Sequence, residues 1–167
     1  MRQLLIPEAR AKLLNGELLK QLSKRLACRI ELKDKNEIVI DGDAYAEYMS
    51  YSVLEAFGRG FDINTAFKLL SEDCFFKSVN LKELFKNEKQ IKRMKARVIG
   101  EKGKTKKYIE AVSGAEISLY GNTISGIGTL DQLNVAYSAI NILLEGGTHK
   151  KAYRVMEKAR KELAYKL

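Results

Sequence analysis

The amino-acid sequence predicts an α+β protein made of two tandem copies of one small unit. The chain has 167 residues, which is long enough for two units of about 80 residues. Displacing the sequence against itself by 86–87 positions brings the two halves into register. Each half also alternates helix-period segments with pairs of short strand-like segments. The predicted domains are residues 1–73 and residues 74–167.

The first half is interpreted as a short strand, two helices joined by a turn, two strands, a long helix and one closing helix. Glu17–Ala27 carries leucines at helical spacing. Arg29–Lys33 and Glu37–Asp41 alternate apolar and polar residues, which is typical of adjacent strands. Asp43 stands where it can cap the long helix Ala44–Phe57.

The second half repeats this order. Phe75–Leu81 is predicted to be its first strand, and Lys104–Val112 has apolar residues at helical spacing. Glu116–Tyr120 and Thr123–Ile127 form a second strand pair around a Gly-Asn turn. The charged segment Lys82–Lys92 has no counterpart in the first half, so the sequence predicts an insertion there.

Capping residues mark the starts of the remaining helices. Thr129 and Gln132 have the form of a capping box for a helix that runs to about Leu144. Asp62 and Thr148 stand at the starts of the two closing helices. Glycines that follow the two long helices are expected to end them.

The most informative segment is the run Gly100-Glu101-Lys102-Gly103, which follows the apolar Ile99 and precedes a lysine-rich helix. Two glycines let the backbone turn tightly and approach a ligand closely, because no Cβ intervenes. The unpaired N–H groups at the start of the next helix favour a phosphate. Four lysines add positive charge around the same turn. The pattern predicts a site for a phosphate backbone.

The net charge of +9 is unevenly distributed. Residues 1–75 carry 11 Lys and Arg against 12 Asp and Glu, whereas residues 76–167 carry 19 against 9. A basic region concentrated in one half is typical of polyanion binding. A solvated lysine-rich face of the kind found in thermophile proteins is the alternative explanation.

The order strand–helix–GxxG–helix–strand–strand–helix, from about Phe75 to Gly147, resembles a KH domain of type I. Taken together, the two halves resemble the tandem-KH ribosome-assembly family called partner-of-Nob, which is related to the Krr proteins. The run from Gly100 to Lys106 (Gly-x-x-Gly-Lys-Thr-Lys) and the helix start from Lys150 to Tyr153 carry the resemblance. The compact length is similar to that of archaeal members.

This resemblance implies two tandem type I KH domains, the first with a degenerate GxxG loop, and an extra helix that closes each unit. It implies an RNA-binding protein whose second domain clamps about four nucleotides of single-stranded RNA. The expected target is the 3′ region of small-subunit rRNA or its precursor during ribosome biogenesis. The expected protein partner is a Nob-type endonuclease.

Two positions depart from the family pattern. The first half has Leu13-Leu14-Asn15-Gly16 at the loop position, so the first glycine is replaced and no lysine is present. We therefore expect that copy to have lost phosphate binding and to serve packing or a protein partner. In the second loop, Glu101 places a carboxylate where phosphates are expected, although the neighbouring lysines outnumber it.

The resemblance implies a groove between the glycine-loop helices and the central strand of the second unit. Loop N–H groups and Lys102 are expected to hold the RNA backbone, and Ile99 to line the groove. Ile117 is expected either to line the groove or to belong to the core. The predicted RNA-binding residues are Arg97, Ile99, Gly100, Glu101, Lys102, Gly103, Lys104, Lys106, Lys107, Ile117, Ser118 and Leu119.

The sequence does not favour an enzyme. His149, the one histidine, is expected to cap a helix or lie at the surface, and no nucleophile, Walker A or metal-ligand motif is present. We expect no cofactor and no metal. Cys28 and Cys74 fit neither a metal site nor a disulfide framework. With no signal peptide or apolar membrane span in the sequence, a cytoplasmic protein is expected.

Two other functions remain open from the sequence. The nearly neutral first half would suit a protein–protein adaptor in ribosome assembly, for which RNA contact is incidental. The same glycine loop would also suit a regulator that binds single-stranded DNA or mRNA. The sequence leaves the RNA motif, the partner surface and the oligomeric state undetermined.

Overall fold

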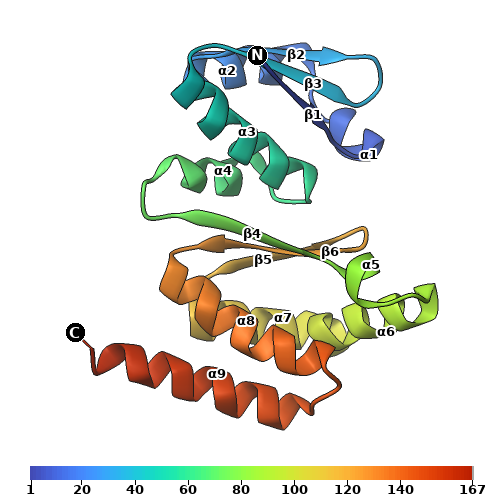
Figure 1. Cartoon of the computed structure of the whole chain (residues 1–167), viewed down its shortest axis with the longest axis vertical. Helices are drawn as coiled ribbons and strands as arrows, with labels where there is room; N and C mark the ends of the chain where they lie inside the picture. Colours follow the sequence, from blue (N-terminus) through green and yellow to red (C-terminus); the bar gives the residue numbers. More distant parts are fainter. Residues whose placement is uncertain (167) are drawn as a thin grey trace. The chain divides into compact units, whose positions relative to one another are not determined.

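The computed structural model describes residues 1–166 and divides the chain into two compact units, Met1–Ser71 and a second that begins at Glu72 (Figure 1). The division falls two residues before the position predicted from the sequence. Each unit contains a three-stranded antiparallel sheet with helices packed on one face. We describe the units separately as unit 1 and unit 2.

Unit 1 has its sheet in the order β1-β3-β2. The strand pair matches the sequence prediction residue for residue, and Ile30 lies opposite Ile40 in the register of the sheet. Ile38 and Ile40 point toward the helices and are fully buried. The elements of unit 1 are β1 (Arg2–Leu5), α1 (Glu8–Ala11), α2 (Gly16–Leu26), β2 (Arg29–Lys33), β3 (Glu37–Asp41), α3 (Ala44–Gly58), α4 (Ile63–Ala66) and the 3₁₀ helix η1 (Phe67–Leu70).

Side-chain caps start the helices of unit 1. The Asp43 carboxylate accepts a hydrogen bond from the Ala46 N–H at 2.9 Å and starts α3, as predicted. Asp62 caps α4 in the same way. The closing element of unit 1 is short, however, because α4 passes into η1 within four residues. The predicted closing helix is thus a full helix only in unit 2.

Unit 2 has its sheet in the order β4-β6-β5, which is the order of unit 1 with each strand replaced by its repeat. The capping box is confirmed, since Thr129 and Gln132 exchange hydrogen bonds at the start of α8. The elements of unit 2 are β4 (Phe75–Asn80), α5 (Leu81–Leu84), α6 (Glu88–Ile99), the 3₁₀ helix η2 (Glu101–Gly103), α7 (Lys104–Ser113), β5 (Glu116–Tyr120), β6 (Thr123–Gly128), α8 (Leu130–Leu144) and α9 (His149–Ala164).

The predicted insertion at Lys82–Lys92 is confirmed, because the chain between the first strand and the helix after the loop is longer in unit 2 (residues 81–103) than in unit 1 (residues 6–15). Half of this segment belongs to α6, which begins after Asn87 accepts a hydrogen bond from the Lys89 N–H. Ile91 and Val98 of α6 are buried in the core, at a spacing of seven residues that places them on one helix face. The many lysines of α6 hid this apolar face in the sequence.

The core of unit 2 lies between the sheet and α6, α7, α8 and α9. Tyr137 of α8 is buried beneath the sheet, with its hydroxyl 3.0 Å from the Ile124 carbonyl and 3.1 Å from the Lys77 carbonyl. Burial raises the pKa of this hydroxyl, so it remains a neutral donor. The helix α9 packs along α8 and α7 through the buried Ala152 and Met156.

Candidate nucleic-acid interface

The glycine loop of unit 2 adopts a backbone that its sequence explains. Gly100 has φ 75° and ψ 172°, a combination that is essentially restricted to glycine. Lys102 and Gly103 follow with φ 53° and φ 76°, both in the left-handed region. The chain therefore reverses between α6 and α7 within four residues, and η2 is this turn.

The two glycines are required to different degrees. A Cβ on Gly100 would lie 2.1 Å from Thr105 Oγ1 and 2.7 Å from the Thr105 backbone nitrogen. No atom lies within 4 Å of a Cβ placed on Gly103, so only its left-handed backbone favours glycine there. Gly100 is thus fixed by packing and backbone together, whereas Gly103 leaves open space for a ligand to approach.

A groove opens beside this loop along α6. Its volume is about 480 Å³, within the range of ligand-binding clefts. Ile99, which was predicted to line a groove, is part of its wall. The lining residues are Glu88, Ile91, Lys92, Lys95, Ala96 and Ile99 from α6 and Asn122 from the β5–β6 turn.

The far wall of the groove is tied to α6 by a hydrogen bond. The Lys95 ammonium group donates to the Gly121 carbonyl at 2.5 Å and so connects α6 to the β5–β6 turn. Ile91, Ala96 and Asn122 were absent from the predicted site. The spacing of 88, 91, 92, 95, 96 and 99 is that of one helix face, and this periodicity was the signal that could have found them.

The lysines around the loop differ in whether their ammonium groups are free to contact a ligand. The side chains of Lys102, Lys104 and Lys107 are exposed. Lys106 is half-buried and forms an ion pair with Glu110, with Nζ 3.0 Å from Oε1. Glu110 also accepts a hydrogen bond from the Ile117 N–H, so this ion pair ties α7 to β5. The structure thus leaves Lys102, Lys104 and Lys107 as mobile charges, and gives Lys106 a structural partner.

Arg97 does not lie in the groove, and the geometry does not support its predicted contact with RNA. Its guanidinium donates to the Leu143 carbonyl at 2.5 Å and to the Gly147 carbonyl. His149 Nε2 lies 2.9 Å from the Arg97 carbonyl, so it contacts α6 rather than capping its own helix, which Thr148 does. These contacts fasten the end of α8 and the start of α9 to α6.

The strand residues of the predicted site also need correction. Ile117 is only 4% exposed and belongs to the core, which decides the open alternative. Leu119 is half-buried and packs on the same core. Because successive strand residues point to opposite faces, Ser118 faces away from the helices and lies opposite Ser125 of β6. None of the three lines the groove along α6.

The corresponding turn of unit 1 has a different backbone. None of Leu13, Leu14, Asn15 and Gly16 has a positive φ. Asn15 instead caps α2 by accepting a hydrogen bond from the Leu18 N–H at 2.8 Å, and Leu14 is buried. The turn therefore lacks the left-handed geometry of the unit 2 loop, in agreement with the missing first glycine and lysine.

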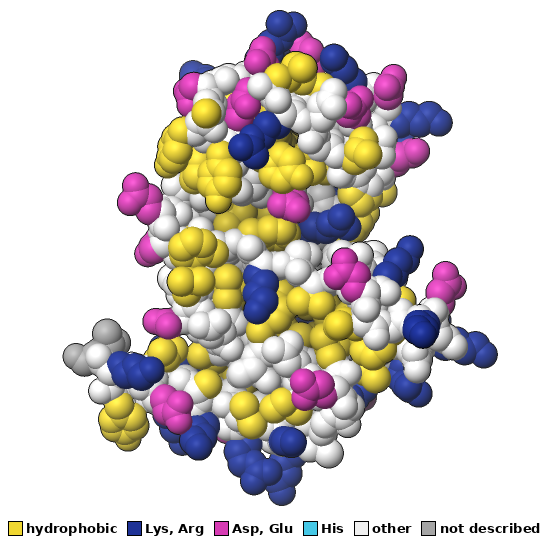
Figure 2. Space-filling model, in the orientation of Figure 1, with side chains coloured by type: hydrophobic (Ala, Val, Ile, Leu, Met, Phe, Trp, Pro, Cys, Tyr) yellow, Lys and Arg dark blue, Asp and Glu magenta, His cyan; other side chains and the backbone are white. Residues whose placement is uncertain are grey.

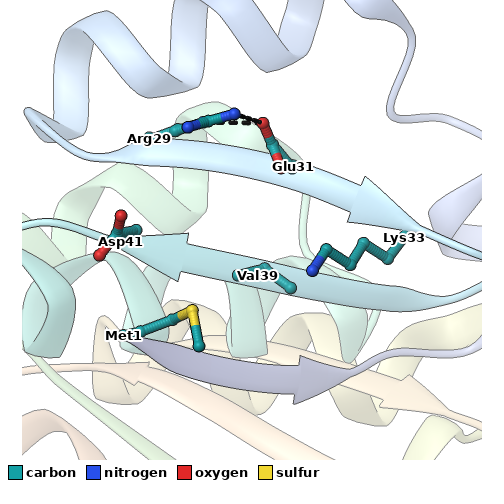
Figure 3. A pocket seen from close by; sticks show the side chains of 6 residues that line it. All are labelled: Met1, Arg29, Glu31, Lys33, Val39 and Asp41. Carbon is teal, nitrogen blue, oxygen red and sulfur yellow. Dashed lines mark hydrogen bonds and ion pairs between the residues drawn. The ribbon is translucent and has the colours of Figure 1, made fainter.

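Unit 1 has a pocket of about 190 Å³ on its sheet, around Val39 (Figure 3). Two of its four charged side chains, Arg29 and Glu31, form an ion pair at 2.6 Å. Across the described residues 1–166, no group of three or more His, Cys, Asp or Glu residues is arranged to hold a metal ion. Over the same residues, no helix is long and apolar enough to cross a membrane.

Comparison with known proteins places the glycine loop in a family. The family model described as "Eukaryotic type KH-domain (KH-domain type I)" matches residues 75–161. The KH domain-containing protein MJ0443 of Methanocaldococcus jannaschii is 32% identical over 166 residues, covering 95% of this chain and 73% of that protein. The pre-rRNA-processing protein pno1 of Aspergillus fumigatus is 27% identical over 146 residues, which are 82% of this chain. The match spans 58% of the fungal protein's length.

Solved structures agree with this assignment. Dim2p from Pyrococcus horikoshii OT3 is 31% identical, with a TM-score of 0.84 over 94% of this chain and 98% of that one. A chain in the a/eIF2alpha-aDim2p-rRNA complex from the same organism is also 31% identical, with a TM-score of 0.87 over 96% of this chain and 94% of that one. The chain therefore belongs to the KH-domain family that contains archaeal Dim2p and the Pno1 pre-rRNA-processing proteins.

Proposed function

We propose that this protein binds single-stranded RNA in the groove along α6 and holds the RNA backbone at the glycine loop. The observation that carries the proposal is the position of the left-handed turn Gly100–Gly103 at the end of an apolar groove of about 480 Å³. KH domains clamp about four nucleotides with such a loop. A helix pair that merely packed on a sheet would not need the glycine-restricted backbone of Gly100.

In this proposal the groove and the loop have separate roles. Bases lie against Ala96 and Ile99, the accessible apolar side chains of the groove wall, with the buried Ile91 beneath them. The backbone amides of Glu101 and Lys102 point to phosphate, and the exposed Lys102 ammonium adds a charge-assisted contact. Lys104 supplies further positive charge at the start of α7. Glu101 opposes these contacts, so we expect moderate affinity.

Unit 1 is proposed to be a degenerate KH domain, so that the chain holds a degenerate domain in residues 1–73 and an intact one in residues 74–167. The shared strand order of the two sheets supports this proposal. The family model matches the second half alone. The capped turn at Asn15 and the net charge of −1 over residues 1–75 suit packing or a protein partner better than RNA.

The proposed target is the 3′ region of small-subunit rRNA or its precursor, bound during ribosome biogenesis. Support comes from the relatives, which include a pre-rRNA-processing protein and a Dim2p solved with rRNA. We propose that this chain positions RNA in the cytoplasm and that a Nob-type endonuclease cleaves it. The chain itself is proposed to be no enzyme, because the groove wall carries lysines, one glutamate and apolar groups rather than a paired nucleophile and base.

The experiment that tests the proposal replaces both variable loop residues, Glu101→Asp with Lys102→Asp. Aspartate tolerates the left-handed backbone at position 102, and both side chains are exposed, so the fold is expected to survive. Two carboxylates would then stand where phosphates are bound. We expect at least a tenfold loss of affinity for single-stranded RNA, since a charge-assisted contact is worth about 1.5–3 kcal/mol.

The matched control lies in the corresponding turn of unit 1, where Lys12 and Leu13 are both exposed. Lys12→Asp with Leu13→Asn lowers the net charge by the same two units as the loop variant and should leave RNA affinity unchanged. Unaltered RNA binding by the 101/102 variant, with its circular dichroism intact, would show that the loop is not the clamp. Equal binding of matched RNA and DNA strands would favour the single-stranded DNA regulator. An adaptor is favoured instead if neither nucleic acid binds measurably.

A further inference from the structure

The exposed face of α9 carries a row of positive charges that the groove does not explain. Lys150, Arg154, Lys158 and Lys161 are spaced by four, four and three residues, so they lie along one side of the helix. All four side chains are exposed. Figure 2 shows Lys and Arg side chains gathered along the edge formed by α9. We call these four residues the α9 basic row.

The helix that carries this row is held firmly in unit 2. The Tyr153 hydroxyl donates to Thr105 Oγ1 at 3.0 Å, and the Tyr108 hydroxyl donates to the Glu157 carboxylate. The rings of Tyr108 and Tyr153 meet edge to face at 4.7 Å. The opposite face of α9 buries Ala152 and Met156 completely. The basic row is therefore presented at a fixed position rather than on a mobile tail.

The row has no internal electrostatic partner. No member of it forms an ion pair within the part of the chain that the structure describes. Glu157, four residues before Lys161, is turned inward and occupied by Tyr108. Like charges four residues apart, such as Lys150 and Arg154, disfavour the helix. Glu157 and Glu162, the two acids of α9, lie within four residues of the row, but neither forms an ion pair with it in the described structure.

Comparison with the neighbouring helix α8 shows that the positive charge is concentrated on one side of unit 2. The fifteen residues of α8 contain no Lys or Arg, although part of α8 is also exposed. On α7, by contrast, Lys104 and Lys107 are exposed between the glycine loop and α9. Positive charge thus continues from the loop across α7 to α9, and it is missing on the α8 side.

The position and length of the row fit an extended phosphate backbone. Thr105 lies two residues after Gly103, so its hydrogen bond to Tyr153 places the first turns of α9 directly behind the loop. With a rise of about 1.5 Å per residue, the row extends about 16 Å. Because a KH groove holds only about four nucleotides, a longer RNA extends beyond it, and the row lies within reach of an RNA strand that leaves at the loop.

We propose that the α9 basic row binds the sugar–phosphate backbone of the RNA segment that continues beyond the groove. This inference rests on the proposed RNA binding at the groove and adds a second contact site to it. The contact is independent of sequence, because ammonium and guanidinium groups recognise phosphate rather than bases. It makes affinity depend on RNA length.

The test uses the full-length chain with Lys150, Arg154 and Lys158 each changed to Gln, which keeps helix propensity. The probes are a six-nucleotide RNA and an eighteen-nucleotide RNA that contains it, both with the sequence of the small-subunit rRNA 3′ end. We expect affinity for the hexamer to change less than twofold. Affinity for the longer RNA should fall by about tenfold or more, and its log K against log salt slope should become shallower by about 2.

A control variant separates the location of charge from its amount. Lys12, Lys20 and Lys24 are exposed in unit 1, and changing all three to Gln removes the same three charges. This control should bind both RNAs like the parent. The inference is overturned if the α9 variant binds the longer RNA like the parent, if it weakens both RNAs equally, or if the unit 1 control loses as much.

The loop variant, Glu101→Asp with Lys102→Asp, distinguishes this inference from the proposed function. If the groove binds RNA, that variant weakens both the hexamer and the longer RNA. If it weakens neither, the proposed function fails, whatever the α9 variant does. If it weakens both while the α9 variant matches its parent on the longer RNA, only the α9 inference fails.

Discussion

The Tyr153 hydroxyl donates a hydrogen bond to Thr105 Oγ1 at 3.0 Å and links α9 to the first turn of α7. The same Thr105 oxygen would lie 2.1 Å from a Cβ on Gly100. Thr105 therefore contacts Tyr153 of α9 on one side and Gly100 of the glycine loop on the other. The shape of the loop therefore depends on a residue 48 positions away from Thr105 in the sequence.

Tyr153→Phe should loosen this loop without changing any charge. Removing the hydroxyl leaves the buried Thr105 oxygen without its donor, which costs about 1 kcal/mol of unfolding free energy. RNA affinity should fall about two- to fivefold, as a less rigid loop pays more entropy on binding. Urea unfolding and fluorescence anisotropy measure the two effects. Tyr165→Phe, at a residue 89% exposed, is the control and should alter neither.

Gly100→Ala and Gly103→Ala should differ in stability. The first combines a glycine-restricted backbone with a steric overlap against Thr105, and we expect a loss of about 3 kcal/mol. The second requires only a left-handed residue in open space, so about 1 kcal/mol is expected. Thermal unfolding of the two variants provides the comparison. Equal losses would mean that the packing of Thr105 on Gly100 is not as described.

Substitutions of Arg97 and Lys102 should have opposite effects: one should lower stability alone, and the other should weaken RNA binding alone. Arg97→Met removes the donor to the Leu143 and Gly147 carbonyls and should cost about 2 kcal/mol of stability. It should leave the salt dependence of RNA binding unchanged. Lys102→Met should show the reverse, with unaltered unfolding and a slope shallower by about 0.7. If Arg97→Met also made the slope of log K against log salt shallower, Arg97 would contact RNA after all.

The salt dependence of short-RNA binding reports the number of phosphates at the loop. For a hexamer held by about three to five phosphate contacts, log K should fall with log salt at a slope of about −2 to −4. Titrations between 50 and 500 mM KCl by anisotropy give this slope. A slope near zero would mean that the lysines around the loop are only a solvated face.

Local sequence patterns were sufficient for most of the elements and for the loop, but not for the start of α6 or for the short closing element of unit 1. Arg29–Lys33 and Glu116–Tyr120 were predicted with the bounds that the structure has, because strand alternation is a property of neighbouring residues. The caps at Asp43 and Thr129 were equally predictable, since each capping side chain bonds a backbone group three residues away. The special backbone of Gly100 was likewise visible from its residue type.

The sequence by itself determined the α+β units, the capped starts of α3, α4, α8 and α9 and the glycine loop, because all of these depend on contacts within a few residues. Tertiary structure alone decided that Ile117 is core, and that Arg97 bonds to carbonyls 46 and 50 positions away. It also decided that Ile91 and Asn122 meet across one groove. Such contacts bring distant segments together, and no local pattern shows which buried or charged side chain will find which partner.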